Sequence, residues 1–97
     1  MDVVFRSNRL RDCAEDQTVA MREWGVVVGT RYYHRVRTLL DMATFEGLFD
    51  LHSLRLHPLT GGRRSEYAIT LSGRWRLIIT RAGNTITVEE VSNHYDD

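Results

Sequence analysis

This chain contains no lysine, a single cysteine, a single proline and no long apolar run. A lone Cys13 excludes an intramolecular disulfide framework and is typical of a reducing compartment. No apolar stretch approaches the roughly 18–20 residues that span a bilayer, and residues 1–12 lack the apolar core of a signal peptide. We therefore expect a cytoplasmic protein with no membrane partner.

The absence of lysine makes all 13 basic residues arginines, balanced by 13 acidic residues and a formal net charge of zero. A codon bias toward arginine explains this composition as well as any function does. Arginine stays charged at any accessible pH and offers phosphate a planar fork of donors, but it is a poor proton shuttle. Acid–base chemistry would therefore fall to histidine, tyrosine or carboxylate side chains.

The charges are unevenly distributed along the chain. Between Leu51 and Arg81 a single acid, Glu66, stands against six arginines, namely Arg55, Arg63, Arg64, Arg74, Arg76 and Arg81. The other acids lie in the first fifty residues and close to the C-terminus. This pattern predicts a cationic surface on a neutral molecule.

A length of 97 residues fits one domain, residues 1–97, with one modest core. Val3–Phe5 is β-branched and aromatic and predicts a first strand. A helix follows, capped by Ser7 or Asn8 and ending near Gly25, with a break near Asp16 left open.

The next segment predicts a second helix that begins between Val26 and Thr30 and ends near Ala43. Gly29 weakens its first turn. Its expected buried stripe is Tyr32, Val36, Leu39, Leu40 and Ala43, and its expected water-facing residues are Arg31, Arg35, Arg37 and Asp41. Residues 45–51 predict a short helical or turn segment that adds to the same core.

After a basic loop, HPLTGGRR (residues 57–64), the period becomes alternating. Runs at 67–71, 74–80 and 85–91 predict strands, separated by turns at Ser72-Gly73 and at residues 82–84. The fold class is therefore α+β, with an N-terminal strand and two helices packed on a small, mainly antiparallel sheet. Alternation places Trp75 and Leu77 toward the helices, and Arg74, Arg76 and Ile78 on the other side.

Four features of the C-terminal half are candidates for chemistry. Arg76 lies on the uncovered side of the sheet, although pairing with Glu89 or Glu90 on the next strand explains it equally well. Arg63 and Arg64 lie in a glycine-containing loop that suits an anion, or that is simply a basic loop. His94-Tyr95 and His57 provide proton-transfer groups, yet most such residues are ordinary surface residues.

No sequence motif for a metal ion or another cofactor is present. His52 and His57 are five residues apart, but no HExxH, CxxC or paired histidine–carboxylate pattern accompanies them. Cys13 falls in a predicted helical stripe and is interpreted as a core thiol. We therefore expect no metal and no cofactor.

The order of elements, with VVF near the start, RLHPLTGGRRSEYAITLSGRWRLI in the middle and VEEVSNHY at the end, resembles the HigB-like branch of the RelE/ParE toxin superfamily. The resemblance covers almost the whole chain. It implies a toxin of a type II toxin–antitoxin pair that cleaves mRNA on the ribosome without a metal. Its partner would be an antitoxin that is often a helix-turn-helix DNA-binding protein.

The resemblance also implies roles for particular residues. Arg64 and Arg76 would neutralise the phosphate, and His94 or Tyr95 would transfer the proton. The other basic residues assigned to RNA contact are Arg55, His57, Arg63, Arg74 and Arg81. The chain departs from the family pattern at Thr60, Gly62 and Ser65, where the family often has a lysine, an acid and a glycine.

Two other functions stay open at this point. One is a gyrase-directed toxin of the ParE type, which binds its target and needs no proton transfer. The other is a non-catalytic module that binds a partner or regulates it. A neutral chain would also bind RNA less tightly than the strongly basic toxins, unless its cationic face supplies the whole interaction.

Overall fold

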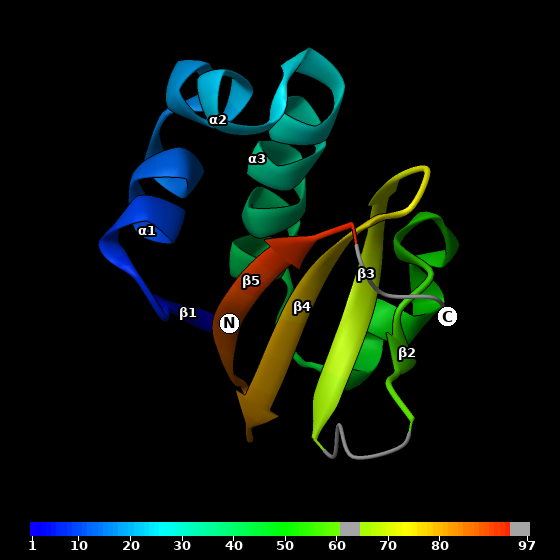
Figure 1. Cartoon of the computed structure of the whole chain (residues 1–97). Coiled ribbons are helices and arrows are strands. Elements are labelled where there is room, and N and C mark those ends of the chain that lie inside the picture. Colours follow the sequence, from blue (N-terminus) through cyan, green and yellow to red (C-terminus); the bar gives the residue numbers. More distant parts are fainter. Residues whose placement is uncertain (61–64, 94–97) are drawn as a thin grey trace.

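The computed structural model describes residues 1–60 and 65–93. Its elements are β1 (Asp2–Phe5), α1 (Asn8–Glu15), α2 (Gln17–Trp24), α3 (Val26–Asp41), the 3-10 helices η1 (Glu46–Asp50) and η2 (His52–Leu54), β2 (His57–Pro58), β3 (Glu66–Ser72), β4 (Trp75–Ala82) and β5 (Thr85–Ser92). They form one sheet in the order β1-β5-β4-β3-β2 (Figure 1). β1 is parallel to β5, and the other neighbours are antiparallel. The predicted α+β class is confirmed.

The first predicted helix is divided in two at Asp16. Ser7 is its N-cap, because the Ser7 hydroxyl accepts a hydrogen bond from the Leu10 N–H at 3.2 Å. At Asp16 the backbone is extended, and the Asp16 carboxylate accepts from the Thr18 N–H at 2.9 Å, which starts α2. One aspartate therefore ends α1 and caps α2, and this produces the break that the sequence left open.

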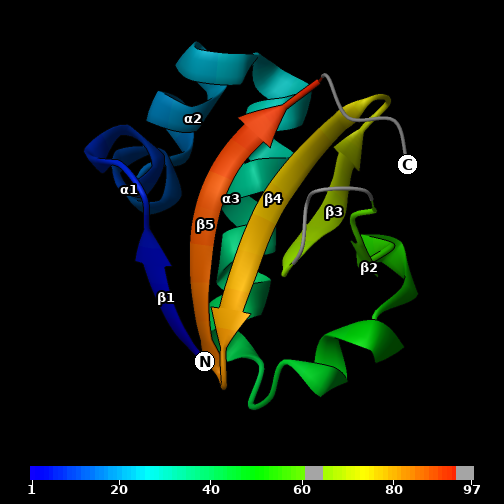
Figure 2. The same ribbon diagram turned by 60° about the horizontal axis from the view of Figure 1, so that its bottom comes forward.

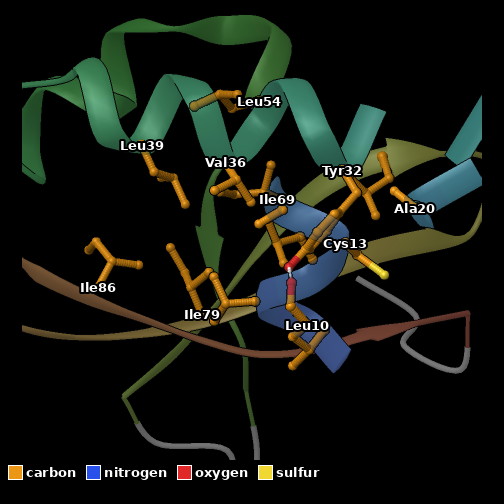
Figure 3. Packing of buried hydrophobic residues seen from close by; sticks show 14 of the residues in the cluster. Leu10, Cys13, Ala20, Tyr32, Val36, Leu39, Leu54, Ile69, Ile79 and Ile86 are labelled. Carbon is orange, nitrogen blue, oxygen red and sulfur yellow. Dashed lines mark hydrogen bonds between the residues drawn. The ribbon is translucent and has the colours of Figure 1, made fainter. Parts of the chain in front are cut away.

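Helix α3 covers one side of the sheet and runs behind β4 and β5 (Figure 2). Val36 and Leu39 of α3 and Ile69, Ile79 and Ile86 of the strands are fully buried in one core cluster (Figure 3). No helix in residues 1–60 and 65–93 has the length and apolarity needed to cross a membrane. The core therefore lies between the helices and the inward side of the sheet.

Tyr32 ties the helices together within this core. Its side chain is fully buried, and its hydroxyl donates a 2.7 Å hydrogen bond to the Leu10 carbonyl of α1 (Figure 3). Burial, and then the nearby Cys13, raise the pKa of Tyr32 well above its ordinary value, so the phenol stays protonated. A buried polar group is tolerated here because it is hydrogen-bonded.

Parts of the α3 prediction were wrong. Leu40 is 42% exposed and Ala43 is exposed, because Leu40 is turned about 100° from the buried Leu39 and the helix ends at Asp41. The half-buried Arg35 and Arg37 do not simply face water, since their guanidinium groups donate to backbone carbonyls. The exposed Arg31 also donates, to the Leu71 carbonyl.

Gly29 marks the closest approach of α2 and α3. A Cβ atom built on Gly29 would lie 2.4 Å from the Ala20 carbonyl oxygen and 2.6 Å from the Met21 nitrogen. These are backbone atoms, so the clash can be relieved only by moving one helix away from the other. Gly29 weakens the helix by propensity, but it allows the two helices to pack.

We predict that Gly29→Ala destabilises the protein by about 2 kcal/mol or more, although the same change in an open helix stabilises by about 1 kcal/mol. Urea unfolding followed by circular dichroism measures the effect. Gly47→Ala is the control, because its Cβ would meet side-chain atoms and no backbone, namely the flexible end of Met42 at 2.9 Å and the Thr44 hydroxyl oxygen at 3.4 Å. Equal stability of Gly29→Ala and the parent protein would contradict this account.

Candidate functional site

The side of the sheet opposite α3 forms the candidate site. Residues that pair across neighbouring strands point to the same side of a sheet. One such row is Thr70–Arg76–Ser92 and another is His57–Ala68–Ile78–Glu90, and because their members are two residues apart on each strand, both rows lie on the same side. We call this side the outer face; its described residues include His57, Glu66, Ala68, Thr70, Arg76, Ile78, Thr80, Glu90 and Ser92. The strand alternation predicted for Arg76 is confirmed.

Arg76 is held at the end of the outer face where β3 turns into β4. Its Nη1 donates to the Gly73 carbonyl at 2.6 Å and to the Trp75 carbonyl at 3.0 Å. Gly73 has φ +55°, a conformation that glycine adopts freely and that shapes the turn around this contact. These two backbone carbonyls thus help to fix the guanidinium group in place.

His57 enters the outer face from β2, a two-residue edge strand that begins the predicted basic loop. Pro58 is tolerated at this edge because no donor is needed there, and pairing continues as the Leu59 N–H donates to the Glu66 carbonyl at 2.9 Å. The His57 Nδ1 lies 2.6 Å from the Arg55 carbonyl, which can only accept, so the proton is on Nδ1. In the neutral ring the buried Nε2 is therefore the basic nitrogen.

The middle of the outer face is not open to water. Ala68 and Ile78 are 0% exposed, and Ser92 is 5% exposed, although all three lie on the side away from α3. Ile78 thus lies on the predicted face but is buried there. Ala68 and Ile78 form a small apolar floor that separates His57 from Glu90 across the sheet. Arg76 lies in the next row of cross-strand partners, beside this floor.

Carboxylates share the outer face with the cations, as the alternative interpretation of Arg76 from the sequence allows. A β-bulge between Ile78 and Ile79 leaves Glu89 as an extra residue, while Glu90 lies opposite Ile78. Glu89 accepts from the Thr80 hydroxyl at 2.8 Å and pairs with Arg6 at 3.4 Å. Residues 51–81 are rich in arginine, but β5 lies outside this range, pairs with β4 and brings these acids to the same side of the sheet.

The other predicted site residues fall in different places. Arg63, Arg64, His94 and Tyr95 lie outside the described residues, so their predicted convergence with Arg76 stays a prediction. Arg55 and Arg74 are exposed, after η2 and in the β3–β4 turn. Arg81 lies on the helix side, where it pairs with Glu46 at 2.9 Å and stacks 4.4 Å from the Phe45 ring centre. The structure does not bring Arg81 to the outer face.

A metal site and a reactive cysteine are the two other kinds of site considered for this fold. Within residues 1–60 and 65–93, no three histidine, cysteine or acidic side chains are grouped so as to hold a metal ion. Cys13 is buried in the core, and burial followed by the nearby Glu23 raises the pKa of its thiol. Cys13 is therefore suited to packing and not to nucleophilic attack.

Comparison of the chain with models of known protein families and with curated proteins finds no match.

We predict that Cys13 in the native protein reacts with a thiol reagent at least about 10³-fold more slowly than in guanidinium chloride, since only the rare unfolded chain exposes it. The rate measured by absorbance should follow the unfolded fraction as urea is added. Rapid labelling without urea, at a rate that depends on pH only through the thiolate fraction of Cys13, would contradict this prediction. It would show that the reagent reaches the core at α1 in the folded protein.

Proposed function

We propose that this protein is the toxin of a type II toxin–antitoxin pair and cleaves mRNA as a metal-independent endoribonuclease associated with the ribosome. The observation that carries this proposal is the outer face, on which a backbone-anchored Arg76 and a His57 with a basic Nε2 lie in neighbouring rows over a buried floor. In the α+β fold the helices lie on the other side of the sheet and do not cover this face.

The proposed reaction is attack of a ribose 2′-oxygen on its own adjacent phosphorus. The bond from phosphorus to the 5′-oxygen breaks, the 2′-hydroxyl proton goes to a base, and the departing 5′-oxygen receives a proton. The products are a 2′,3′-cyclic phosphate and a 5′-hydroxyl. Such a reaction needs cations at the phosphate oxygens and groups that exchange protons near neutral pH.

Each requirement is assigned to named residues. Arg76 and Arg64 neutralise the phosphate, and His94 or Tyr95 transfers the proton. His57 is the described imidazole on the same face. Arg55, Arg63 and Arg74 contact the RNA backbone. The cognate antitoxin, a helix-turn-helix protein, silences the toxin by covering the cationic residues or by preventing ribosome entry.

The carboxylates of the outer face bear on how tightly RNA binds. Glu89 and Glu90 reduce the positive potential that phosphate meets, so we expect weaker binding than for a strongly basic toxin. The Glu89 carboxylate contacts Thr80 and Arg6, and Arg76 contacts the Gly73 carbonyl at the β3–β4 turn.

We predict that the parent protein cleaves a reporter mRNA in translating extract and that Arg76→Gln lowers the cleavage rate by at least about 10²-fold, because the charge developing on phosphate loses a fixed donor. Arg76→Lys should restore only part of the rate. Primer extension and detection of the cyclic phosphate measure the reaction. A 2′-deoxy substitution at the cut should abolish it, because the attacking 2′-oxygen is then missing.

Arg22→Gln is the matched control, because Arg22 is exposed on α2 and the charge change is the same. Replacing His94 by Ala and Tyr95 by Phe should also end cleavage and growth arrest. Growth arrest that persists in this double variant, with altered DNA supercoiling, would favour a gyrase-directed toxin. No arrest and no cleavage by the parent protein would favour a partner-binding module.

A further inference from the structure

A second cationic surface lies at the end of the sheet where α3, η2 and the β3–β4 turn meet. We call it the hairpin cluster and define it by Arg31, Arg35, Arg55 and Arg74. The Arg31 Nη1 donates to the Leu71 carbonyl at 2.8 Å. Arg35 donates from Nη2 to the Ser53 carbonyl at 3.2 Å, and its Nε points to the Thr70 carbonyl at 3.4 Å.

These contacts bring together segments that are distant in sequence. Ser53 precedes Arg55 by two residues, and Arg74 lies in the turn between Ser72 and Trp75. The tip of this turn lies toward the same end of the molecule as the first turns of α3 in both ribbon views (Figures 1 and 2). One helix therefore presents two arginines beside an arginine-bearing turn.

Arg31 and Arg35 are a like-charge pair without an acid. They are one helical turn apart, and among the described residues neither takes part in an ion pair. Burial and then the nearby Arg31 lower the pKa of Arg35, which means that its positive charge is disfavoured where it lies. An anion bound between the two guanidinium groups would offset the repulsion between them.

The carbonyl contacts leave donors available for such an anion. Arg31 uses one nitrogen, so its Nη2 and Nε hydrogens are not engaged by the Leu71 carbonyl. Arg35 likewise keeps Nη1. Because backbone carbonyls already fix both guanidinium groups, little side-chain entropy remains to be lost on binding.

The surroundings favour a polyanion over a folded protein as the ligand. Three of the large apolar residues exposed in the described chain, Val26, Val27 and Leu40, belong to α3, and none belongs to η2 or to the β3–β4 turn. Protein interfaces usually have an apolar or aromatic centre. The β3–β4 turn and η2 provide no such centre, and arginine forks suit the phosphates of nucleic acid.

We propose that the hairpin cluster binds the phosphate backbone of an RNA strand that passes from the outer face over the β3–β4 turn toward α3. This inference rests on the proposed function, since it extends the same RNA beyond the scissile phosphate. Arg76 links the two surfaces, because it lies on the outer face and donates to Gly73 in the turn. The contacts are independent of RNA sequence.

The experiment measures binding of a fluorescent 2′-O-methyl oligonucleotide, which cannot be cleaved, by anisotropy at several salt concentrations. Arg31→Gln should weaken binding several-fold at low salt and lower the slope of log affinity against log salt by about 0.7, as expected for one lost phosphate contact to a single strand. Arg31→Lys should keep the slope. Arg22→Gln is the charge-matched control and should behave as the parent protein, and thermal unfolding verifies that each variant is folded.

The outcomes separate this inference from the nuclease. Equal affinity and slope for Arg31→Gln and Arg22→Gln would overturn the hairpin cluster, even while Arg76→Gln still abolishes cleavage. Binding that depends on Arg31 in a protein that never cleaves mRNA would support the cluster and overturn the nuclease. A poly-glutamate peptide serves as a second ligand. If Arg31→Gln loses binding to this peptide but not to the oligonucleotide, the cluster binds acidic protein and not RNA, and the proposal is overturned.

Discussion

The burial of alternate strand residues under α3 is the constraint on which the rest of this structure depends. Leu77 and Ile79 are fully buried on the helix side, and this forces Arg76 and Ile78 to the other side. A slip of one residue in β4 would expose the leucine and bury the arginine among apolar side chains, at a cost of several kcal/mol. The core therefore sets the composition of the outer face.

The strands and their faces were predictable because alternation and turn residues are local signals. The helices were predictable in position, and the break at Asp16 was visible because an aspartate there can cap a following helix. The exposure of Leu40 was not visible, since helical period alone cannot tell which residues at the edge of a stripe are covered. The role of Gly29 in packing was not predictable from the sequence either, because it depends on the position of the neighbouring helix α2.

The candidate site was predictable only in part, for a similar reason. Arg76 follows from alternation within one strand, and that prediction holds. The acids of β5 reach the outer face through strand pairing and a β-bulge, and the placement of Arg81 against Phe45 depends on the fold around η1. Such features come from residues far apart in sequence, so no spacing rule reveals them.

An all-arginine set of cations has a structural consequence that lysine would not share. Arg31, Arg35, Arg37 and Arg76 each donate to backbone carbonyls, which a rigid fork can do while retaining further donors. A lysine ammonium is compact and more strongly hydrated, so placing it against a carbonyl costs more. Such arginines can therefore connect neighbouring elements of the fold and keep donors that can bind an anion.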